Sequence, residues 1–207
     1  GELQRQAEAL TERRRKGAAE LTAAVEGELR ALGMKAASFQ VRLVSVRVET
    51  PEGFELPSGP RGRERAEFWL APNPGEESRR LRDAASGGER ARVVLALRTA
   101  LRGAGPGQTL LFDEVDVGIG GGTARRVGER LRRLSQDHQV VCITHLPQIA
   151  ALGDTHARIV KRVRRGRTHT LVERLDGEGR VTEIARIAGG GKITPATRAH
   201  ARDLLGV

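Results

Sequence analysis

The chain has 207 residues, of which 38% are apolar and 30% are charged, so it can form one good hydrophobic core, or one core with an appended element. No apolar run approaches the roughly 18–20 residues that span a bilayer, and the N-terminus has neither the charged start nor the apolar stretch of a signal peptide, so neither membrane insertion nor secretion is expected. The single cysteine, Cys142, excludes an internal disulfide and fits a reducing, cytoplasmic compartment.

The formal net charge is +10, and only four of the 36 basic residues are lysine. Basic surface attracts nucleic acid through counterion release, although so strong an arginine bias can also arise from codon composition. An aromatic content of 2% provides no stacking platform for single-stranded bases. Three basic segments are candidates for DNA contact: Arg13-Arg14-Arg15-Lys16; Arg125, Arg126, Arg130, Arg132 and Arg133; and Lys161-Arg162 with Arg164, Arg165 and Arg167.

Residues 2–32 contain no proline and repeat leucine or valine at helical spacing, which predicts one long helix. Its apolar seam is weak around 13–17, so the end of a coiled coil or a single amphipathic helix fits better than a strong zipper. Gly33 is a helix stop. The alternation over 39–48 then predicts a half-buried strand, and 66–71 its return strand, after a turn-rich excursion at 50–63.

From Ser86 onward, helical and apolar segments alternate, which predicts a parallel sheet with crossover helices. Thr194-Pro195 has the pattern of an N-cap followed by the first helical residue. The predicted helices are 88–102, 122–136, 179–189 and 195–205, and the predicted strands are 108–112, 139–144, 155–161 and 168–175, the last two around the turn Arg165-Gly166.

Residues 109–116 read Thr-Leu-Leu-Phe-Asp-Glu-Val-Asp, a strand-like run that ends in two adjacent carboxylates, Asp113 and Glu114. Because carboxylates are rarely buried without a partner, a buried strand that ends in two of them usually has a cation or a proton to manage. The pattern is typical of a Walker B site, in which Asp113 holds Mg²⁺ through water and Glu114 polarises the water that attacks the γ-phosphate of ATP. The alternative is two solvated acids that cap a strand.

Ser86-Gly87-Gly88-Glu89 stands ahead of this strand and directly before an apolar helical run. Ser86 is a natural N-cap, and the two glycines leave backbone N–H groups bare at a helix start, where anions bind. An ordinary capped helix with a flexible lead-in, Ala84-Ala85, is the alternative.

His145 follows the predicted strand 139–144, so it should lie at the same carboxyl edge of the sheet as Asp113 and Glu114. A histidine there can donate a hydrogen bond to the γ-phosphate; alternatively it packs under Leu146-Pro147.

The run Gly189-Gly190-Gly191-Lys192 resembles a phosphate-binding P-loop, but that pattern needs Ser or Thr after the lysine, where this chain has Ile193. No strand is predicted before it. We therefore expect a loop before the last helix and no Walker A motif in this chain, so the phosphate cradle and its lysine must come from elsewhere.

The chain resembles the C-terminal half of an ABC-type ATPase head of the SMC kind. The resemblance rests on a signature loop, a Walker B motif, an Asp-containing loop and a histidine that senses the nucleotide, in the absence of a Walker A motif. From about Phe68 to the C-terminus, the amino-acid sequence is similar to that of the bacterial RecN family. Residues 1–67 match that family in the arrangement of their elements more than in their sequence. The segments that carry the resemblance are Ala-Ser-Gly-Gly-Glu at 85–89, Asp-Glu-Val-Asp-Val-Gly-Ile-Gly-Gly at 113–121 and Cys-Ile-Thr-His-Leu-Pro-Gln-Ile-Ala at 142–150.

The resemblance implies an α/β fold: a coiled-coil-end helix at 1–33, then a C-terminal head lobe at 34–207 with a β hairpin and a largely parallel sheet with flanking helices. It implies ATP and Mg²⁺ as ligands, sandwiched between two heads. The implied roles are γ-phosphate contact from the opposing head for Ser86, Gly87, Gly88 and Glu89, catalytic base for Glu114, action across the dimer interface for Asp116, and γ-phosphate sensing for His145.

The implied function is ATP hydrolysis between two engaged heads in support of DNA double-strand break repair and recombination, in the cytoplasm at the nucleoid. The implied partners are the N-terminal Walker A half of the same head, a second head and DNA. Without the Walker A half we expect this chain alone to be inactive. The alternatives are a non-hydrolysing lobe that binds DNA or a partner, and the head of another SMC-like repair ATPase.

Overall fold

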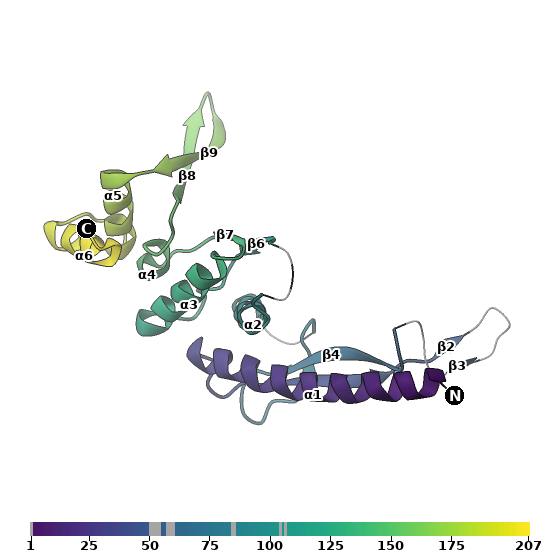
Figure 1. The fold of residues 1–207 in the computed structure, drawn as a ribbon. Helices are drawn as coiled ribbons and strands as arrows, with labels where there is room; N and C mark the ends of the chain where they lie inside the picture. The colour runs from purple at the N-terminus through teal and green to yellow at the C-terminus, as the bar shows by residue number, and fades with distance from the viewer. Residues whose placement is uncertain (1, 50–54, 57–60, 84–85, 104, 106) are drawn as a thin grey trace. The chain divides into compact units, whose positions relative to one another are not determined.

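A computed structural model describes residues 2–49, 55–56, 61–83, 86–103, 105 and 107–207 (Figure 1). The turn-rich excursion predicted at 50–63 falls largely outside these residues, and so does the lead-in Ala84-Ala85. The fold is α/β, and its contacts divide it into two units, Gly1–Arg102 and Gly103–Val207, each of which is described by itself. No helix among the described residues is long and apolar enough to cross a membrane.

The first unit contains the predicted helix and hairpin. The helix is α1 (Glu2–Ala31), and the hairpin pairs β1 (Ser38–Ser45) with β4 (Glu64–Ala71) in antiparallel register from Ser38 opposite Ala71 to Ser45 opposite Glu64. The short strand β5 (Arg79–Arg80) extends this sheet beyond β4, and β2 (Val48–Glu49) pairs with β3 (Glu55–Leu56). Local alternation of apolar and polar residues was sufficient to predict this hairpin.

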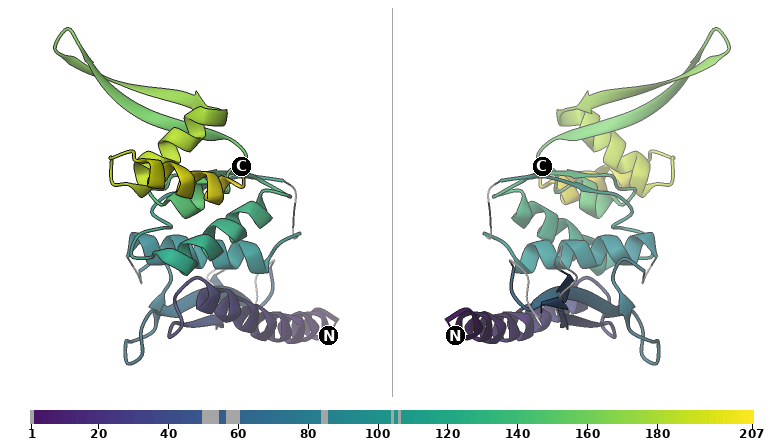
Figure 2. Two further views of the ribbon diagram at one scale, coloured as in Figure 1. Left: turned by 90° about the vertical axis from the view of Figure 1, so that its left-hand side faces the viewer. Right: turned by 90° about the vertical axis from the view of Figure 1, so that its right-hand side faces the viewer.

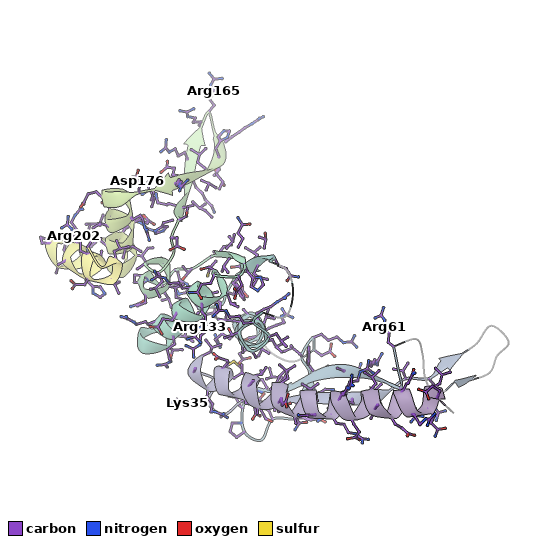
Figure 3. The ribbon with its side chains drawn as sticks, viewed as in Figure 1. Lys35, Arg61, Arg133, Arg165, Asp176 and Arg202 are labelled. Atoms are coloured by element: carbon purple, nitrogen blue, oxygen red, sulfur yellow. The ribbon has the colours of Figure 1, made fainter. Side chains whose placement is uncertain are left out.

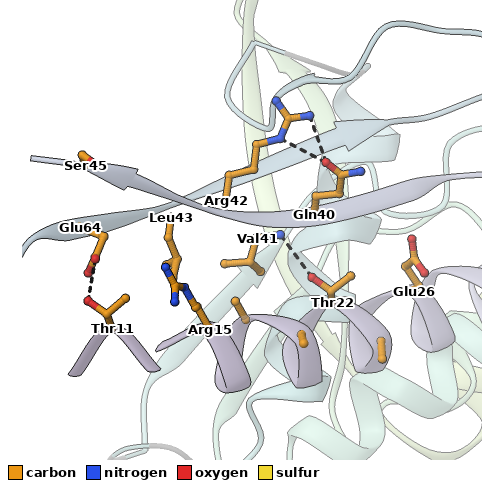
Figure 4. A pocket seen from close by; sticks show the side chains of 13 residues that line it. Thr11, Arg15, Thr22, Glu26, Gln40, Val41, Arg42, Leu43, Ser45 and Glu64 are labelled. Carbon is orange, nitrogen blue, oxygen red and sulfur yellow. Dashed lines mark hydrogen bonds between the residues drawn. The ribbon is translucent and has the colours of Figure 1, made fainter. Parts of the chain in front are cut away.

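Helix α1 covers the free edge of β1. The backbone N–H of Phe39 donates to Glu26 Oε1 at 3.1 Å. The backbone N–H of Val41 donates to Thr22 Oγ1 at 3.3 Å (Figure 4). Farther along the helix, Thr11 Oγ1 donates to Glu64 Oε1 at 2.6 Å. Side chains of α1 therefore satisfy N–H groups that an uncovered edge strand would expose.

The core of the first unit forms where α1 meets the sheet. Its fully buried side chains include Val25 and Leu29 of α1, together with Leu32, Phe39 and Leu70. Phe39 also contacts the Phe68 ring, with 5.7 Å between the ring centroids. Helix α2 (Gly87–Ala100) lies against α1 and completes this unit.

The second unit contains the predicted parallel pairing. Strands β6 (Thr109–Phe112) and β7 (Gln139–Cys142) run parallel from Thr109 opposite Gln139 to Phe112 opposite Cys142, joined by helix α3 (Gly121–Leu134). The parallel sheet is narrower than the predicted one, because the other strand pairs in the described part of the chain are antiparallel.

Three helices follow in the second unit: α4 (Pro147–Ala150), α5 (Gly177–Ala188) and α6 (Pro195–Leu205). The short helix α4 was not predicted. Val181, Ile184 and Ala185 of α5 form a buried cluster with Ala201 of α6. Thr194 caps α6 with its side chain and Pro195 is the first helical residue, as predicted.

A long hairpin projects beyond α5 and α6, as both views in Figure 2 show. Strands β8 (His156–Arg164) and β9 (Arg167–Leu175) pair along their whole length. Arg165 and Gly166 connect them with φ values of 48° and 71°, and two successive positive φ values are the signature of a tight type I′ hairpin turn. The predicted turn at these two residues is thus confirmed.

Candidate functional site

Asp113 and Glu114 lie directly after β6, and both side chains are exposed. Asp113 Oδ1 accepts the backbone N–H of Glu114 at 2.9 Å. Glu114 has a φ of 58°, a left-handed conformation that costs a residue with a Cβ about 1 kcal/mol. Such conformations concentrate at functional sites, and this one turns the backbone sharply between the two carboxylates.

Asp116 joins the loop after β6 to the loop after β7. It is only 2% exposed, and its Oδ2 accepts hydrogen bonds from Thr144 Oγ1 at 2.5 Å and from the His145 backbone N–H at 2.8 Å. His145 Nδ1 lies 3.1 Å from the same oxygen. The predicted Asp loop and the predicted histidine therefore meet at one edge of the parallel sheet.

The His145 side chain itself is 70% exposed, so its ring is held at the surface and is not packed under Leu146 and Pro147. Thr144 Oγ1, besides donating to Asp116, accepts the Leu146 backbone N–H at 3.1 Å. The backbone around His145 is thus fixed while the imidazole remains accessible.

The pKa of the Cys142 thiol, at the end of β7, is affected by burial and by the carboxylates near it. Partial burial raises its pKa to about 12, and the nearby Asp116 and Asp113 carboxylates add to the effect because they disfavour a thiolate. The end of β7 therefore lies near two carboxylates, whose charge adds to the effect of burial. Among the described residues there is no cluster of three or more His, Cys, Asp or Glu that could hold a metal ion by itself.

The signature segment belongs to the first unit. Ser86 is the N-cap of α2: its Oγ accepts the Glu89 N–H at 3.4 Å, and Glu89 Oε2 accepts the Ser86 N–H at 3.1 Å. The predicted cap is confirmed as a reciprocal capping box. Gly87 is the first helical residue, Gly88 is buried, and Ser86 is exposed with its hydroxyl hydrogen free to donate.

The glycine run at 189–192 follows helix α5 and no strand leads into it, which agrees with its interpretation as a loop. Gly189 N–H donates to Ala185 O at 2.9 Å and Gly191 N–H to Arg186 O at 2.8 Å. These bonds close the end of α5, so the backbone N–H groups of both glycines are occupied.

A groove of about 690 Å³ lies within the first unit between α1 and β1 (Figure 4). None of the residues predicted to bind ATP lines it. Its walls are mainly the alanines and threonines of α1 and residues of strand β1.

Strands β6 and β7 were predicted to be buried, but one face of the sheet that they form is exposed. Leu110 and Phe112 are buried, but Leu111, Val141 and Ile143 on the opposite face are 67%, 45% and 49% exposed. Leu111 and Val141 are direct register partners, so the three form one continuous apolar patch. When the residues on both faces of a strand are apolar, the sequence does not show which face is exposed.

Bacterial DNA repair proteins RecN align with nearly the whole chain. The RecN of Halalkalibacterium halodurans is 42% identical over 99% of this chain, that of Streptomyces coelicolor 42% over 96%, and that of Treponema pallidum 44% over 87%. The chain is a homologue of the C-terminal part of RecN. It spans about a third of the length of these RecN proteins, covering 35%, 35% and 31% of them.

The fold agrees with this relationship to RecN. The solved Smc head domain with a coiled coil and joint, derived from Pyrococcus yayanosii, matches at a TM-score of 0.53 with 23% identity, over 81% of this chain and 29% of that chain. No family model matches the chain. The resemblance to RecN and the prediction of an SMC-type head fold are thereby confirmed.

Proposed function

We propose that this chain forms the C-terminal part of an SMC-like ATPase head, which hydrolyses ATP between two engaged heads and supports DNA double-strand break repair and recombination. The observation that carries the proposal is the Asp116 bridge, which ties the loop that follows Asp113 and Glu114 to Thr144 and His145, in a chain 42% identical to RecN. The chain would act in the cytoplasm at the nucleoid, with DNA as a partner.

Glu114 is the proposed general base, and Asp113 the proposed holder of Mg²⁺ through water. Oδ1 of Asp113 is occupied by the Glu114 N–H, while the side chain remains exposed, so its other oxygen can accept from a metal-bound water. Hard carboxylate oxygens suit Mg²⁺, which in nucleotide sites takes its remaining ligands from phosphate and water. When bound, the ion neutralises charge on the phosphates.

His145 is the proposed γ-phosphate sensor, and Asp116 its positioning residue. The Asp116 carboxylate is buried and occupied by Thr144 and His145 of its own loop region, so it holds the imidazole at the surface. The predicted contact across the dimer interface remains assigned to the loop of Asp116, in which the neighbouring Val117 is 48% exposed.

Ser86, Gly87 and Gly88, capped by Glu89, are the proposed contact to the nucleotide of the opposing head. The helix start leaves backbone N–H groups for an anion, and the Ser86 Oγ can accept within its cap while its hydrogen donates to a phosphate oxygen. This role requires a second head, which makes the homodimer part of the proposal.

The apolar patch Leu111, Val141 and Ile143 is the proposed seat for the Walker A half of the same head. A two-stranded sheet is marginally stable alone, and this one presents three large apolar side chains on one face. Further strands and the phosphate-binding lysine would come from that half, so the isolated chain should not hydrolyse ATP.

A hybrid protein tests this function: the chain replaces the matching part of Halalkalibacterium halodurans RecN, which supplies the remainder. The hybrid should hydrolyse ATP, and Glu114→Gln should lower kcat by about 10²–10⁴-fold while ATP binding and dimerisation persist, because only the proton acceptor is removed. Glu129→Gln, the same change on the exposed face of α3, is the matched control and should leave kcat unchanged.

The second candidate function is a non-hydrolysing lobe that binds DNA or a partner, favoured by the net charge of +10. It predicts that Glu114→Gln and Glu129→Gln behave alike in the hybrid, which would exclude the catalytic proposal. The head of a different SMC-like repair ATPase would instead copurify with a tightly bound nuclease subunit.

A further inference from the structure

We propose that the tip of the β8–β9 hairpin is a binding surface for the phosphate backbone of duplex DNA. The proposal deepens the proposed repair function by assigning its DNA contact to a defined surface, and it rests on that function for the choice of DNA as the polyanion. Binding is measured without nucleotide, so it can fail or succeed independently of ATP hydrolysis.

The outer half of the hairpin is strongly positive. Between positions 161 and 170 there are five cationic side chains and no acidic one. Figure 3 shows Arg165 at the end of the hairpin, pointing away from the rest of the second unit. The cations are Lys161, Arg162, Arg164, Arg165 and Arg167, and all five are exposed.

Two arginines nearer the base of the hairpin are ion-paired with glutamates, whereas the cations at its tip are not. Arg158 pairs with Glu173 at 2.7 Å and with Glu183 at 3.4 Å, and Arg162 pairs with Glu173 at 2.7 Å. Within the described part of the chain, no ion pair involves Lys161, Arg164, Arg165 or Arg167. The positive charge at the tip of the hairpin is therefore not compensated by ion pairs among the described residues.

The strand register forces like charges together at the tip. Arg164 lies directly opposite Arg167, on either side of the two-residue turn that contains Arg165. Directly opposed like charges destabilise an antiparallel pair, since their Cβ atoms lie only about 5 Å apart. A phosphate between them would turn this repulsion into charge-assisted hydrogen bonds, for which guanidinium groups are well suited.

The basic segments of α1 and α3 are less suited to bind the phosphate backbone of DNA. On α1, Arg14 donates to the backbone carbonyls of Glu64 and Arg61 at 2.7 Å each, Arg15 pairs with Glu12, and Lys16 pairs with Glu20 at 3.9 Å. On α3, Glu129 stands among the arginines and pairs with Arg125 at 3.2 Å. Among the three candidate segments we therefore favour the hairpin.

Duplex DNA fits this surface better than a single strand. The hairpin contains no Phe, Tyr or Trp on which unstacked bases could stack. Its nine-residue strands extend about 30 Å, and a two-stranded β-ribbon fits the major groove of B-DNA. Arginine contacts to phosphate would give affinity and register without sequence preference.

The test is fluorescence anisotropy of the 207-residue chain with a labelled duplex and with a single strand of the same sequence, over a range of salt. The hairpin triple variant combines Arg164→Gln, Arg165→Asn and Arg167→Gln, because asparagine tolerates the positive φ at position 165. Duplex affinity should fall by at least about tenfold, and the slope of log K against log salt should shrink by up to about 2.7 for three lost contacts.

The matched control removes the same charge from α3 with Arg125→Gln, Arg132→Gln and Arg133→Gln, all exposed. It should change duplex affinity by less than about twofold, since these residues lie outside the proposed surface. Equal losses in both triples would mean that net charge alone drives binding, and would overturn the proposal. So would unchanged affinity of the hairpin triple, or a single strand bound as tightly as the duplex.

Thermal unfolding followed by circular dichroism checks each variant. If the triple variant is unfolded, the double variant Arg164→Gln/Arg167→Gln leaves the turn residues unchanged and should still lose affinity and salt dependence. In the RecN hybrid, the hairpin triple should keep its basal ATP hydrolysis while Glu114→Gln keeps DNA binding. That pattern separates failure of this inference from failure of the proposed ATPase.

Discussion

Asp116 Oδ2 accepts a hydrogen bond from Thr144 Oγ1 at 2.5 Å and thereby connects two loops whose residues are 28 positions apart. The acceptor is a buried carboxylate, and the donor also accepts the Leu146 backbone N–H. This bond holds the histidine loop against the Walker B loop, and its removal is the most direct test of the site's construction.

Thr144→Val should lower the free energy of unfolding by about 1–3 kcal/mol, because a buried carboxylate loses a donor while the side-chain volume is preserved. Urea denaturation measures the change. Thr168→Val, an exposed threonine of β9, is the matched control and should change stability by less than about 0.5 kcal/mol. Equal stability of the two variants would show that the Thr144 bond contributes nothing.

Cys142 should be unreactive in the folded chain. With its pKa raised to about 12 by burial and by Asp116 and Asp113, alkylation by iodoacetamide at pH 8 should be on the order of a thousandfold slower than in urea, because the thiolate is the nucleophile. Asp116→Asn should accelerate the native reaction by removing one of these charges. A native rate as fast as the unfolded rate would contradict this raised pKa.

Acid should destabilise the second unit through Glu183. The hydrogen bond from Arg186 at 2.6 Å, with a further contribution from Arg158, lowers the Glu183 pKa below its ordinary value. A carboxylate whose pKa is lower in the folded state stabilises the fold above its unfolded pKa of about 4.3, and this contribution is lost as the pH falls through the folded value.

The measurement is urea denaturation at pH 7 and at several values below pH 4.5, for the chain and for Glu183→Gln. The variant should show a smaller loss of stability on acidification, because it has no proton to take up at this position. Glu178→Gln, an exposed glutamate of the same helix, is the control and should follow the original chain. Parallel pH curves for the chain and Glu183→Gln would contradict the assignment.

Gly128→Ala should loosen the contact between α3 and α4. A Cβ at Gly128 would lie 2.7 Å from Leu152 Cδ1 and 3.4 Å from Ile149 Cα. Overpacking costs about 1–3 kcal/mol, against about 1 kcal/mol gained from replacing glycine by alanine in a helix, so net destabilisation is expected. Gly122→Ala, nearer the start of α3 where a Cβ meets only Arg126 Nη1 at 3.6 Å, is the control for thermal unfolding.

The features that sequence predicted well are those that depend on nearby residues. Ser86 and Glu89 form a cap over three residues, and the Arg165-Gly166 turn needs only two positive φ values. The N-cap at Thr194 and the two strands of the β1–β4 hairpin are local in the same sense. Backbone geometry and hydrogen bonding over a few positions decide such features, so they can be predicted from the amino-acid sequence.

Other features required the chain to fold. The sequence showed that Asp116 was polar and followed a strand, but its burial and its bonds to Thr144 and His145 depend on the pairing of β6 with β7. The same holds for the exposed face of Leu111 and Val141 and for the opposed arginines at the hairpin tip.

The amino-acid sequence by itself determined the order of the elements, the caps and turns, and the chemistry available at the strand ends, because each follows from neighbouring side chains. The tertiary structure alone decided that Asp116 faces inward to hold His145, and that Arg158 and Arg162 of the hairpin are ion-paired while Arg164, Arg165 and Arg167 at its tip are not. The physical reason is that burial and ion pairing depend on residues brought together from distant positions, which no local pattern records.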